Sequence, residues 1–152
     1  MNTTSNELQI IVWQANYDTG IAVIDAQHRE LGDLINELYR ACRSGGDDVG
    51  VAFKDAMGRM VEYVKKHFKF EHDLMQRIHY PGYHEHVREH EKLIKEILDA
   101  AKDFNEGKRF VPHNFVRLLR DWILSHIAVV DREYVMYIFD QKNKGLLHDI
   151  GL

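Results

Sequence analysis

The chain has 152 residues, a length that fits one domain with a hydrophobic core large enough to fold without disulfides. Apolar residues make up 45% of the sequence and charged residues 29%, a balance typical of a soluble globular protein that excludes extensive disorder. The net charge of −4 provides no basic surface for phosphate backbones or anionic lipids, so we expect no nucleic acid and no membrane among the partners.

The cysteine content and the N-terminal residues indicate the compartment. The single cysteine, Cys42, excludes an intrachain disulfide and a cysteine-based metal site, and it suits a reducing environment. Residues 1–14 lack a basic segment followed by an apolar one, so they do not predict a secretory signal. No stretch approaches the roughly 20 apolar residues that cross a bilayer. We therefore expect a cytoplasmic protein, and we expect it to be a monomer.

The first half of the chain predicts two helices. Residues 24–43 carry apolar side chains at alternating steps of three and four, which is the spacing of one helix face, and a polar turn follows at residues 44–48. The same spacing predicts a longer helix over residues 49–78, which ends before Tyr80-Pro81-Gly82 because proline cannot continue a helix. Its apolar stripe consists of Met57, Met60, Val64, Phe68, Met75 and Ile78.

The second half predicts two further helices. Residues 83–105 carry an apolar stripe that closes at Asn105-Glu106-Gly107. The stripe consists of Leu93, Ile94, Ile97, Leu98, Ala101 and Phe104. The last helix opens near Pro112, a residue suited to a first helical turn, and continues to about residue 139, before a break at residues 142–145.

Four amphipathic helices with short links favour an all-α fold, the up-down-up-down antiparallel four-helix bundle. We place this bundle in residues 21–140. Residues 1–20, which include Trp13 and Tyr17, are expected to form an N-terminal arm against its outside, and residues 141–152 a C-terminal tail.

Ionisable side chains occupy positions where each helix should present an apolar residue to the core. These positions are His28, His67, Glu71, His86, His90 and His126. Burying such groups without partners would cost on the order of 2 to 7 kcal/mol each, so the core must hold something that compensates them. A metal cluster does so, because imidazole and carboxylate bind first-row transition metals and helical bundles build such sites from facing helices.

Each part of this pattern also has an ordinary explanation. A single buried histidine is more often a hydrogen-bonded core residue, and a His-x3-Glu pair is common on helices. A His-x3-His pair can arise by chance in a chain with ten histidines. The coincidence of all these residues on four inward helix faces is what favours a metal site.

The pattern His28, His67-x3-Glu71, His86-x3-His90 and His126-x4-Asp131 resembles, in this order, the ligand pattern of hemerythrins, and most closely that of single-domain bacteriohemerythrins. The flanking Asp25-Ala-Gln-His28, His67-Phe68 before Leu74-Met75, and Tyr80-Pro81 fit as well, so the resemblance covers nearly the whole chain.

The resemblance implies a cofactor of two iron ions per chain with a bridging oxo or hydroxo group. One iron would be bound by His86, His90 and His126, the other by His28 and His67, and both carboxylates, Glu71 and Asp131, would bridge them. The iron with two histidines then keeps an open position for dioxygen. Ligand type alone constrains the metal only partly, so manganese and zinc remain alternatives.

The function that the resemblance implies is reversible dioxygen binding, for storage, delivery or buffering, rather than enzymatic catalysis. An oxygen-consuming enzyme is the expected protein partner. An apolar wall should suppress proton leakage at the site, and we expect it to include Leu31, Phe68, Trp122 and Ile127 as the oxygen pocket. Ordinary core packing explains each of these four residues equally well. Two other functions stay open: a di-iron enzyme acting on peroxide or nitric oxide, and an oxygen or redox sensing module.

Two features depart from a regular pattern. Asp131 follows His126 by five residues, which on an α-helix is a rotation of about 140°, so the two side chains share a face only if the helix is locally distorted. Many relatives carry a second acid after the bridging glutamate, but here that position is His72. We expect His72, His79 and His84 to be solvated near the turn between the second and third predicted helices, and not to bind the metal.

Overall fold

The computed structural model describes residues 9–43, 49–108, 112–147 and 152, and these residues contain helices and no strand. The helices are α1 (Ala22–Arg43), α2 (Val49–Arg77), α3 (Tyr83–Asn105), α4 (Pro112–Ser125) and α5 (Arg132–Asn143), and the π-helix η3 (His126–Asp131) joins the last two. A short 3-10 helix, η2 (Ala15–Tyr17), precedes them. The predicted helices are thus confirmed, whereas the predicted turn at residues 44–48 lies outside the described residues, as do residues 1–8 of the arm and residues 148–151 of the tail.

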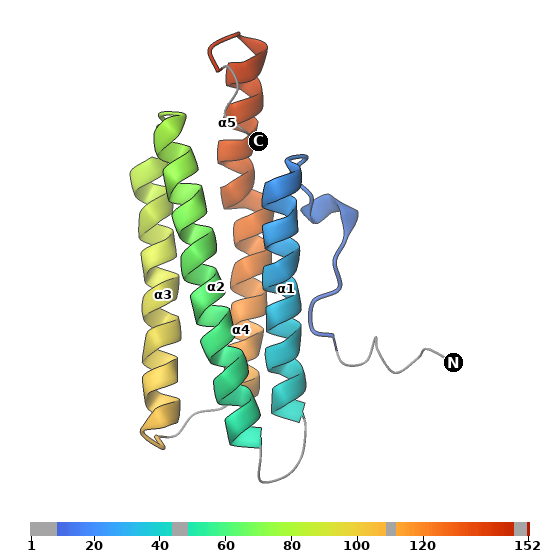
Figure 1. Ribbon diagram of the computed structural model, residues 1–152, viewed down its shortest axis with the longest axis vertical. Helices are drawn as coiled ribbons and strands as arrows, with labels where there is room; N and C mark the ends of the chain where they lie inside the picture. Colours follow the sequence, from blue (N-terminus) through green and yellow to red (C-terminus); the bar gives the residue numbers. More distant parts are fainter. Residues whose placement is uncertain (1–8, 44–48, 109–111, 148–151) are drawn as a thin grey trace, which may run out of the picture.

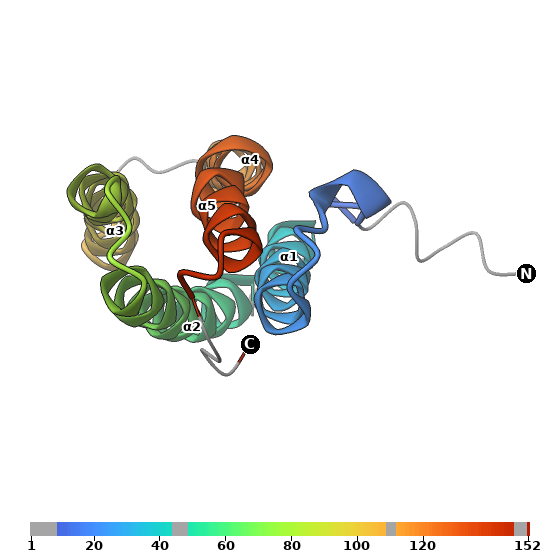
Figure 2. The same ribbon diagram turned by 90° about the horizontal axis from the view of Figure 1, so that it is seen from above.

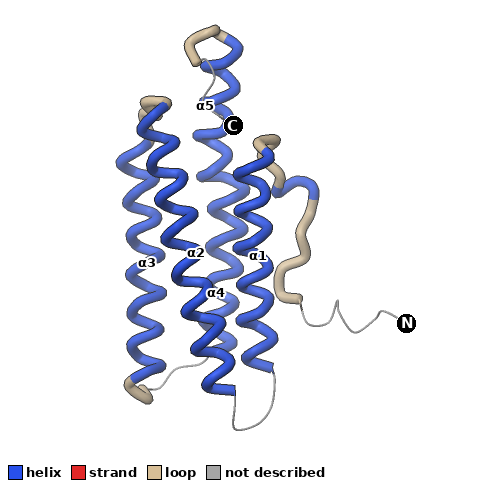
Figure 3. Tube along the Cα trace, in the orientation of Figure 1, coloured by secondary structure: helices blue, strands red, loops and turns tan. Residues whose placement is uncertain are grey.

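The helices form the antiparallel bundle that the sequence predicts. The chain direction alternates from α1 to α2, from α2 to α3, and from α3 to the continuous column of α4, η3 and α5 (Figures 1 and 3). Viewed from above, α2 lies between α1 and α3, and the α4–α5 column lies on the opposite side (Figure 2). Among the described helices, none combines the length and apolar character that a membrane span requires.

The apolar core is divided into two clusters, and the division falls at the level of the ionisable residues. On α1, Leu31 belongs to the larger cluster and Ile24 to the smaller one, with His28 between them. On α2, Phe68 and Leu74 belong to different clusters in the same way. A polar layer therefore crosses the bundle and is sealed by apolar packing on both sides.

The apolar stripes predicted from sequence are buried or half-buried, with one exception. All six stripe positions of α2 lie in the core: Met57, Met60, Val64, Phe68, Met75 and Ile78. The exception is on α3, where the prediction for Leu98 is wrong because its side chain is 45% exposed while Leu93 and Ile97 face the core.

Residues before α1 lie along the outside of that helix (Figure 1). The Asn36 carboxamide accepts hydrogen bonds from the backbone N–H groups of Ile10 and Ile11 and donates one to the Ile11 carbonyl, each 2.9 Å long. The Arg132 guanidinium donates to the carbonyl oxygen of Asn16 at 2.6 Å. The segment is therefore tied both to α1 and to the start of α5, next to the polar layer.

Candidate metal centre

The start of α1 places His28 in the core. Asp25, in the first turn, accepts hydrogen bonds from the Thr19 backbone N–H and hydroxyl, both at 2.7 Å, and from the Gly20 N–H at 3.1 Å. Gly20 has a φ of +94°, a left-handed conformation that glycine adopts at no steric cost. These bonds fix the entry of the chain into α1, so that His28, one turn after Asp25, points inward and is fully buried.

Helix α2 contributes two neighbouring pairs of side chains, each four residues apart. His67 and Glu71 form the first pair, with Nε2 of the histidine 3.0 Å from Oε1 of the glutamate. Phe68 and His72 form the second pair, one position further along the helix. Residues four apart lie on one face, so both pairs face the interior from adjacent strips of α2.

The last helix changes its winding where the sequence predicts a distortion. Residues His126–Asp131 form a π-helix, in which residues five apart stack one above the other. His126 Nε2 consequently lies 2.9 Å from Asp131 Oδ1, although five α-helical residues would turn these side chains apart. The extra residue thus lets one helix aim both side chains into the core.

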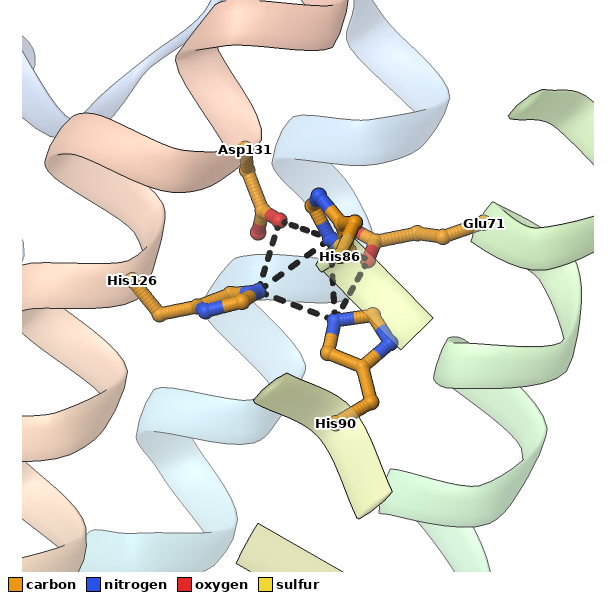
Figure 4. A group of neighbouring side chains, drawn as sticks. All are labelled: Glu71, His86, His90, His126 and Asp131. Carbon is orange, nitrogen blue, oxygen red and sulfur yellow. Dashed lines mark hydrogen bonds and ion pairs between the residues drawn. The ribbon is translucent and has the colours of Figure 1, made fainter. Parts of the chain in front are cut away.

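Three histidines and two carboxylates converge into a first donor set (Figure 4). The Nε2 atoms of His86, His90 and His126 lie 2.9 to 3.3 Å from one another. Glu71 Oε2 lies 3.2 Å from His90 Nε2, and Asp131 Oδ1 lies 3.1 Å from His86 Nε2. Figure 4 shows these side chains arriving from α2, from α3 and from the column of α4 and η3.

A second donor set lies beside the first and uses the other oxygen of each carboxylate. His28 Nε2 is 2.9 Å from Asp131 Oδ2 and 3.5 Å from Glu71 Oε1, the oxygen that also faces His67. Each carboxylate therefore directs one oxygen into the set with three histidines and the other oxygen into the set with two. The donor atoms within each set lie within 4.8 Å of one another, close enough to hold a single ion.

Burial shows that these groups need a partner. The seven side chains are at most 5% exposed. Among the described residues, five buried atoms make no regular hydrogen bond: His28 Nδ1, His28 Nε2, Glu71 Oε2, Asp131 Oδ1 and Arg132 Nε. Three of them, His28 Nε2, Glu71 Oε2 and Asp131 Oδ1, belong to the donor sets and face other donor atoms there. Native cores rarely leave such atoms unsatisfied. Imidazole and carboxylate donors around two adjacent positions fit a pair of first-row transition metal ions.

Without metal, the cluster distributes protons unevenly. Burial alone would lower the pKa of His28 and His86, but the carboxylates Asp131 and Glu71 outweigh it and raise each pKa to about 9. Burial lowers the pKa of His90 to about 4 despite Glu71. Burial would raise the pKa values of Glu71 and Asp131, yet the surrounding histidines hold both well below their usual range. The metal-free cluster is therefore a set of buried ion pairs that metal ions would replace.

Three side chains behind the donor sets were not predicted from sequence. Gln27 Oε1 lies 2.6 Å from His67 Nδ1, and the Tyr134 hydroxyl donates to Glu71 Oε1 at 3.0 Å. Burial and the carboxylates raise the pKa of Tyr134 well above its usual value, so this hydroxyl keeps its proton. His72 is the third, with Nε2 placed 2.8 Å from His90 Nδ1.

The expectation of a solvated His72 is wrong. Its side chain is half-buried, and burial holds its pKa below the usual value. The same expectation is confirmed for His79 and His84, which are exposed.

Aromatic rings cover two of the histidines. The Phe68 ring stacks on His90 with centroids 3.6 Å apart, and the Trp122 ring stacks on His126 at 4.3 Å. Leu31 and Ile127 are each 1% exposed and belong to the same core cluster as Phe68. These positions agree with an apolar wall, while the role of the four residues in an oxygen pocket stays a prediction.

Two clefts reach the three-histidine side of the cluster. A cleft of about 370 Å³ between the start of α3 and η3 is lined by His86, Glu85 and Glu133, among others. A shallower groove of about 660 Å³ is lined by Trp122 and His126. His28 and His67, on the other side, are 0% and 2% exposed.

Comparison with known proteins agrees with this geometry. Residues 19–138 match the family model of the hemerythrin HHE cation binding domain. Bacteriohemerythrin from Methylococcus capsulatus is 30% identical over 129 residues, which cover 84% of this chain and 95% of the relative. Bacteriohemerythrin from Pseudomonas aeruginosa is 33% identical over 82% of this chain and 79% of the relative.

A further relative and a solved structure give the same result. Hemerythrin subunit 1 from Golfingia vulgaris is 30% identical over 81% of this chain and 89% of its own length. The crystal structure of a wild-type hemerythrin superposes with a TM-score of 0.76 at 30% identity, covering 82% of this chain and 95% of the other.

Proposed function

This chain belongs to the hemerythrin family, and from that premise we propose that it holds two iron ions and binds dioxygen reversibly, for storage, delivery or buffering. The observation that carries the proposal is a pair of unequal donor sets that share both carboxylates. One set contains three imidazoles and the other contains two. Glu71 and Asp131 each direct one oxygen into each set.

We assign the donors by this geometry. When bound, one iron would be held by His86, His90 and His126 and the other by His28 and His67, and Glu71 and Asp131 would each offer one oxygen to either ion, together with an oxo or hydroxo group. The iron pair would supply a redox-active site for dioxygen, and the two-histidine side, which has fewer protein donors, would leave the exchangeable position.

The surroundings of the two-histidine side support binding rather than oxidation of a substrate. His28 and His67 are buried away from solvent, and Leu31 and Phe68 contribute to the same apolar core. Excluding water in this way limits proton delivery and side reactions. The Tyr134 hydroxyl is committed to Glu71 and keeps its proton, so it is a poor acid for the site.

The donor chemistry supports the same choice. Five of the seven donors are imidazoles, whereas ferritin-like di-iron proteins use carboxylate-rich sets. The clefts that reach the cluster open on the three-histidine side, away from the exchangeable position. A cytoplasmic location, a monomeric state and an oxygen-consuming enzyme as recipient stay predictions.

The proposal is tested by the visible spectrum of reduced, metal-quantified protein under anaerobic conditions, then in air, then after removal of oxygen. We expect two irons per chain and a charge-transfer band that appears with oxygen and fades without it. A His84→Gln variant, changed at an exposed histidine, should behave identically. A band that appears once and persists would overturn reversible binding in favour of a redox enzyme or sensor, and a chain without iron would overturn the metal assignment.

A further inference from the structure

Two side chains of α2 hold the ring of His90 from different directions. Phe68 stacks on its face, with the ring planes 2° apart. His72 meets its edge: the two imidazole planes are 19° apart, and His72 Nε2 lies 2.8 Å from His90 Nδ1. Because Phe68 and His72 are four residues apart, they clamp a residue of α3 from one face of α2.

We propose that His72 is a positioning residue that fixes which nitrogen of His90 carries the proton and so directs the His90 Nε2 lone pair into the three-histidine donor set. The inference rests on the proposed function in one respect, namely that this donor set holds a metal ion.

The donors and acceptors around His90 leave one consistent arrangement. A neutral imidazole has one N–H and one lone pair. His90 Nε2 faces Glu71 Oε2 at 3.2 Å and His126 Nε2 at 2.9 Å, so a proton there would occupy the space that an ion needs. With the proton on Nδ1, His90 donates to His72 Nε2 and its own Nε2 is free to bind a metal. His72 then carries its proton on Nδ1.

The other donor set contains a matching device. Gln27 Oε1 lies 2.6 Å from His67 Nδ1, and an amide oxygen can only accept, so His67 also keeps its proton on Nδ1. Each donor set thus has one histidine with a dedicated acceptor behind it. Such outer contacts orient metal-binding imidazoles and raise their basicity, and losing one typically costs about 10- to 100-fold in metal affinity.

The two acceptors, Gln27 and His72, carry no charge, whereas a carboxylate does. A carboxylate at position 72 would pull the Nδ1 proton and increase negative charge on His90. The neutral ring of His72 leaves His90 a neutral ligand, which favours the lower oxidation state of a bound metal. His72 therefore influences both how firmly the ion is held and how easily it is reduced.

The test compares three substitutions at one position. His72→Gln keeps an acceptor, His72→Phe keeps a flat ring without an acceptor, and His72→Glu adds a charge. The readout is the rate at which reduced, iron-loaded protein releases iron to a ferrous chelator without oxygen, and His84→Phe is the control on an exposed histidine. We expect release from His72→Phe to be about 10- to 100-fold faster than from wild type, and release from His72→Gln to be close to wild type. His72→Glu should lower the reduction potential of the bound iron.

The outcomes separate this inference from the proposed function. Release at the wild-type rate from His72→Phe would overturn it. Fast release from His72→Gln together with wild-type release from His72→Phe would show that the ring of His72 acts by packing alone. An unchanged potential in His72→Glu would overturn the electronic part. Release is measured without oxygen, so failure of reversible oxygenation leaves the test intact. If the chain takes up no iron, the proposed function fails, and the same variants are compared by release of Zn²⁺.

Discussion

The metal-free protein should be most stable near pH 6.5 and should lose stability as the pH rises above that value. The alkaline loss comes from His28 and His86, whose pKa values are raised from 6.5 to about 9 by Asp131 and Glu71 against the effect of burial. A histidine with a raised pKa binds more protons folded than unfolded between pH 6.5 and 9. Its stabilising contribution is therefore complete below pH 6.5 and is lost as the pH passes through 9.

The size of this effect follows from the shift. The difference between 6.5 and about 9 is about 2.5 pH units, and at about 1.4 kcal/mol per unit each imidazole contributes on the order of 3 kcal/mol. That is a large part of the roughly 5 to 15 kcal/mol that stabilises a typical domain. On the acid side the sign reverses, because the pKa of His90 is lowered to about 4, so stability falls as the pH drops from 6.5 towards 4.

The assay is urea denaturation of chelator-treated protein between pH 5 and pH 10. We expect the unfolding midpoint to fall between pH 6.5 and pH 9, and His28→Gln to reduce that fall while the exposed-site control His84→Gln does not. Metal loading should abolish it, since the imidazoles then bind ions instead of protons. An equal midpoint at pH 6.5 and pH 9 in the metal-free protein would refute the reasoning.

Further predictions concern the groups behind the donor sets and the segment before α1. Tyr134→Phe removes the buried hydrogen bond to Glu71 and should cost about 1.5 to 3 kcal/mol in urea denaturation; an unchanged free energy of unfolding would contradict this. Gln27→Leu leaves His67 Nδ1 without its acceptor and should speed release of one of two bound ions by about 10- to 100-fold, so single-phase release at the wild-type rate would argue against it. Arg132→Met should lower hydrogen-exchange protection in residues 10–18, and undiminished protection there would show that other contacts hold the segment.

The helices could be predicted from sequence because their signals are local. Apolar residues at steps of three and four define each inward face, and Pro81 and Pro112 mark helix boundaries by their own chemistry. The failure at Leu98 has a physical cause as well. The buried strip of α3 is narrow and centred on Leu93 and Ile97, so Leu98, at the edge of the predicted stripe, lies outside it.

The distortion in the last helix was only partly predictable. The spacing from His126 to Asp131 does not fit one face of an α-helix, so the sequence requires some change of winding. Its form, a π-helix over these six residues, depends on backbone hydrogen bonds that the side-chain pattern does not encode.

The groups behind the donor sets could not be predicted because their partners lie on other helices. His72 follows Glu71, and one residue is a rotation of about 100°, which on an isolated helix points away from the ligand face. In the bundle, that flank of α2 faces α3, so the position meets His90 instead of solvent. Tyr134 carried a usable signal, since it lies three residues after Asp131 and therefore near the same helix face.

The arrangement of α2 shows where the surroundings of the donor sets can change while the donors stay in place. His67 and Glu71 form one strip of the helix and are constrained by the donor sets, whereas Phe68 and His72 form the adjacent strip, supply no donor atom and both contact His90. A change on the second strip leaves every donor in place but alters the proton and charge behind one of them. Residues one position after the ligands are therefore where this fold can adjust metal retention and reduction potential without rebuilding its core.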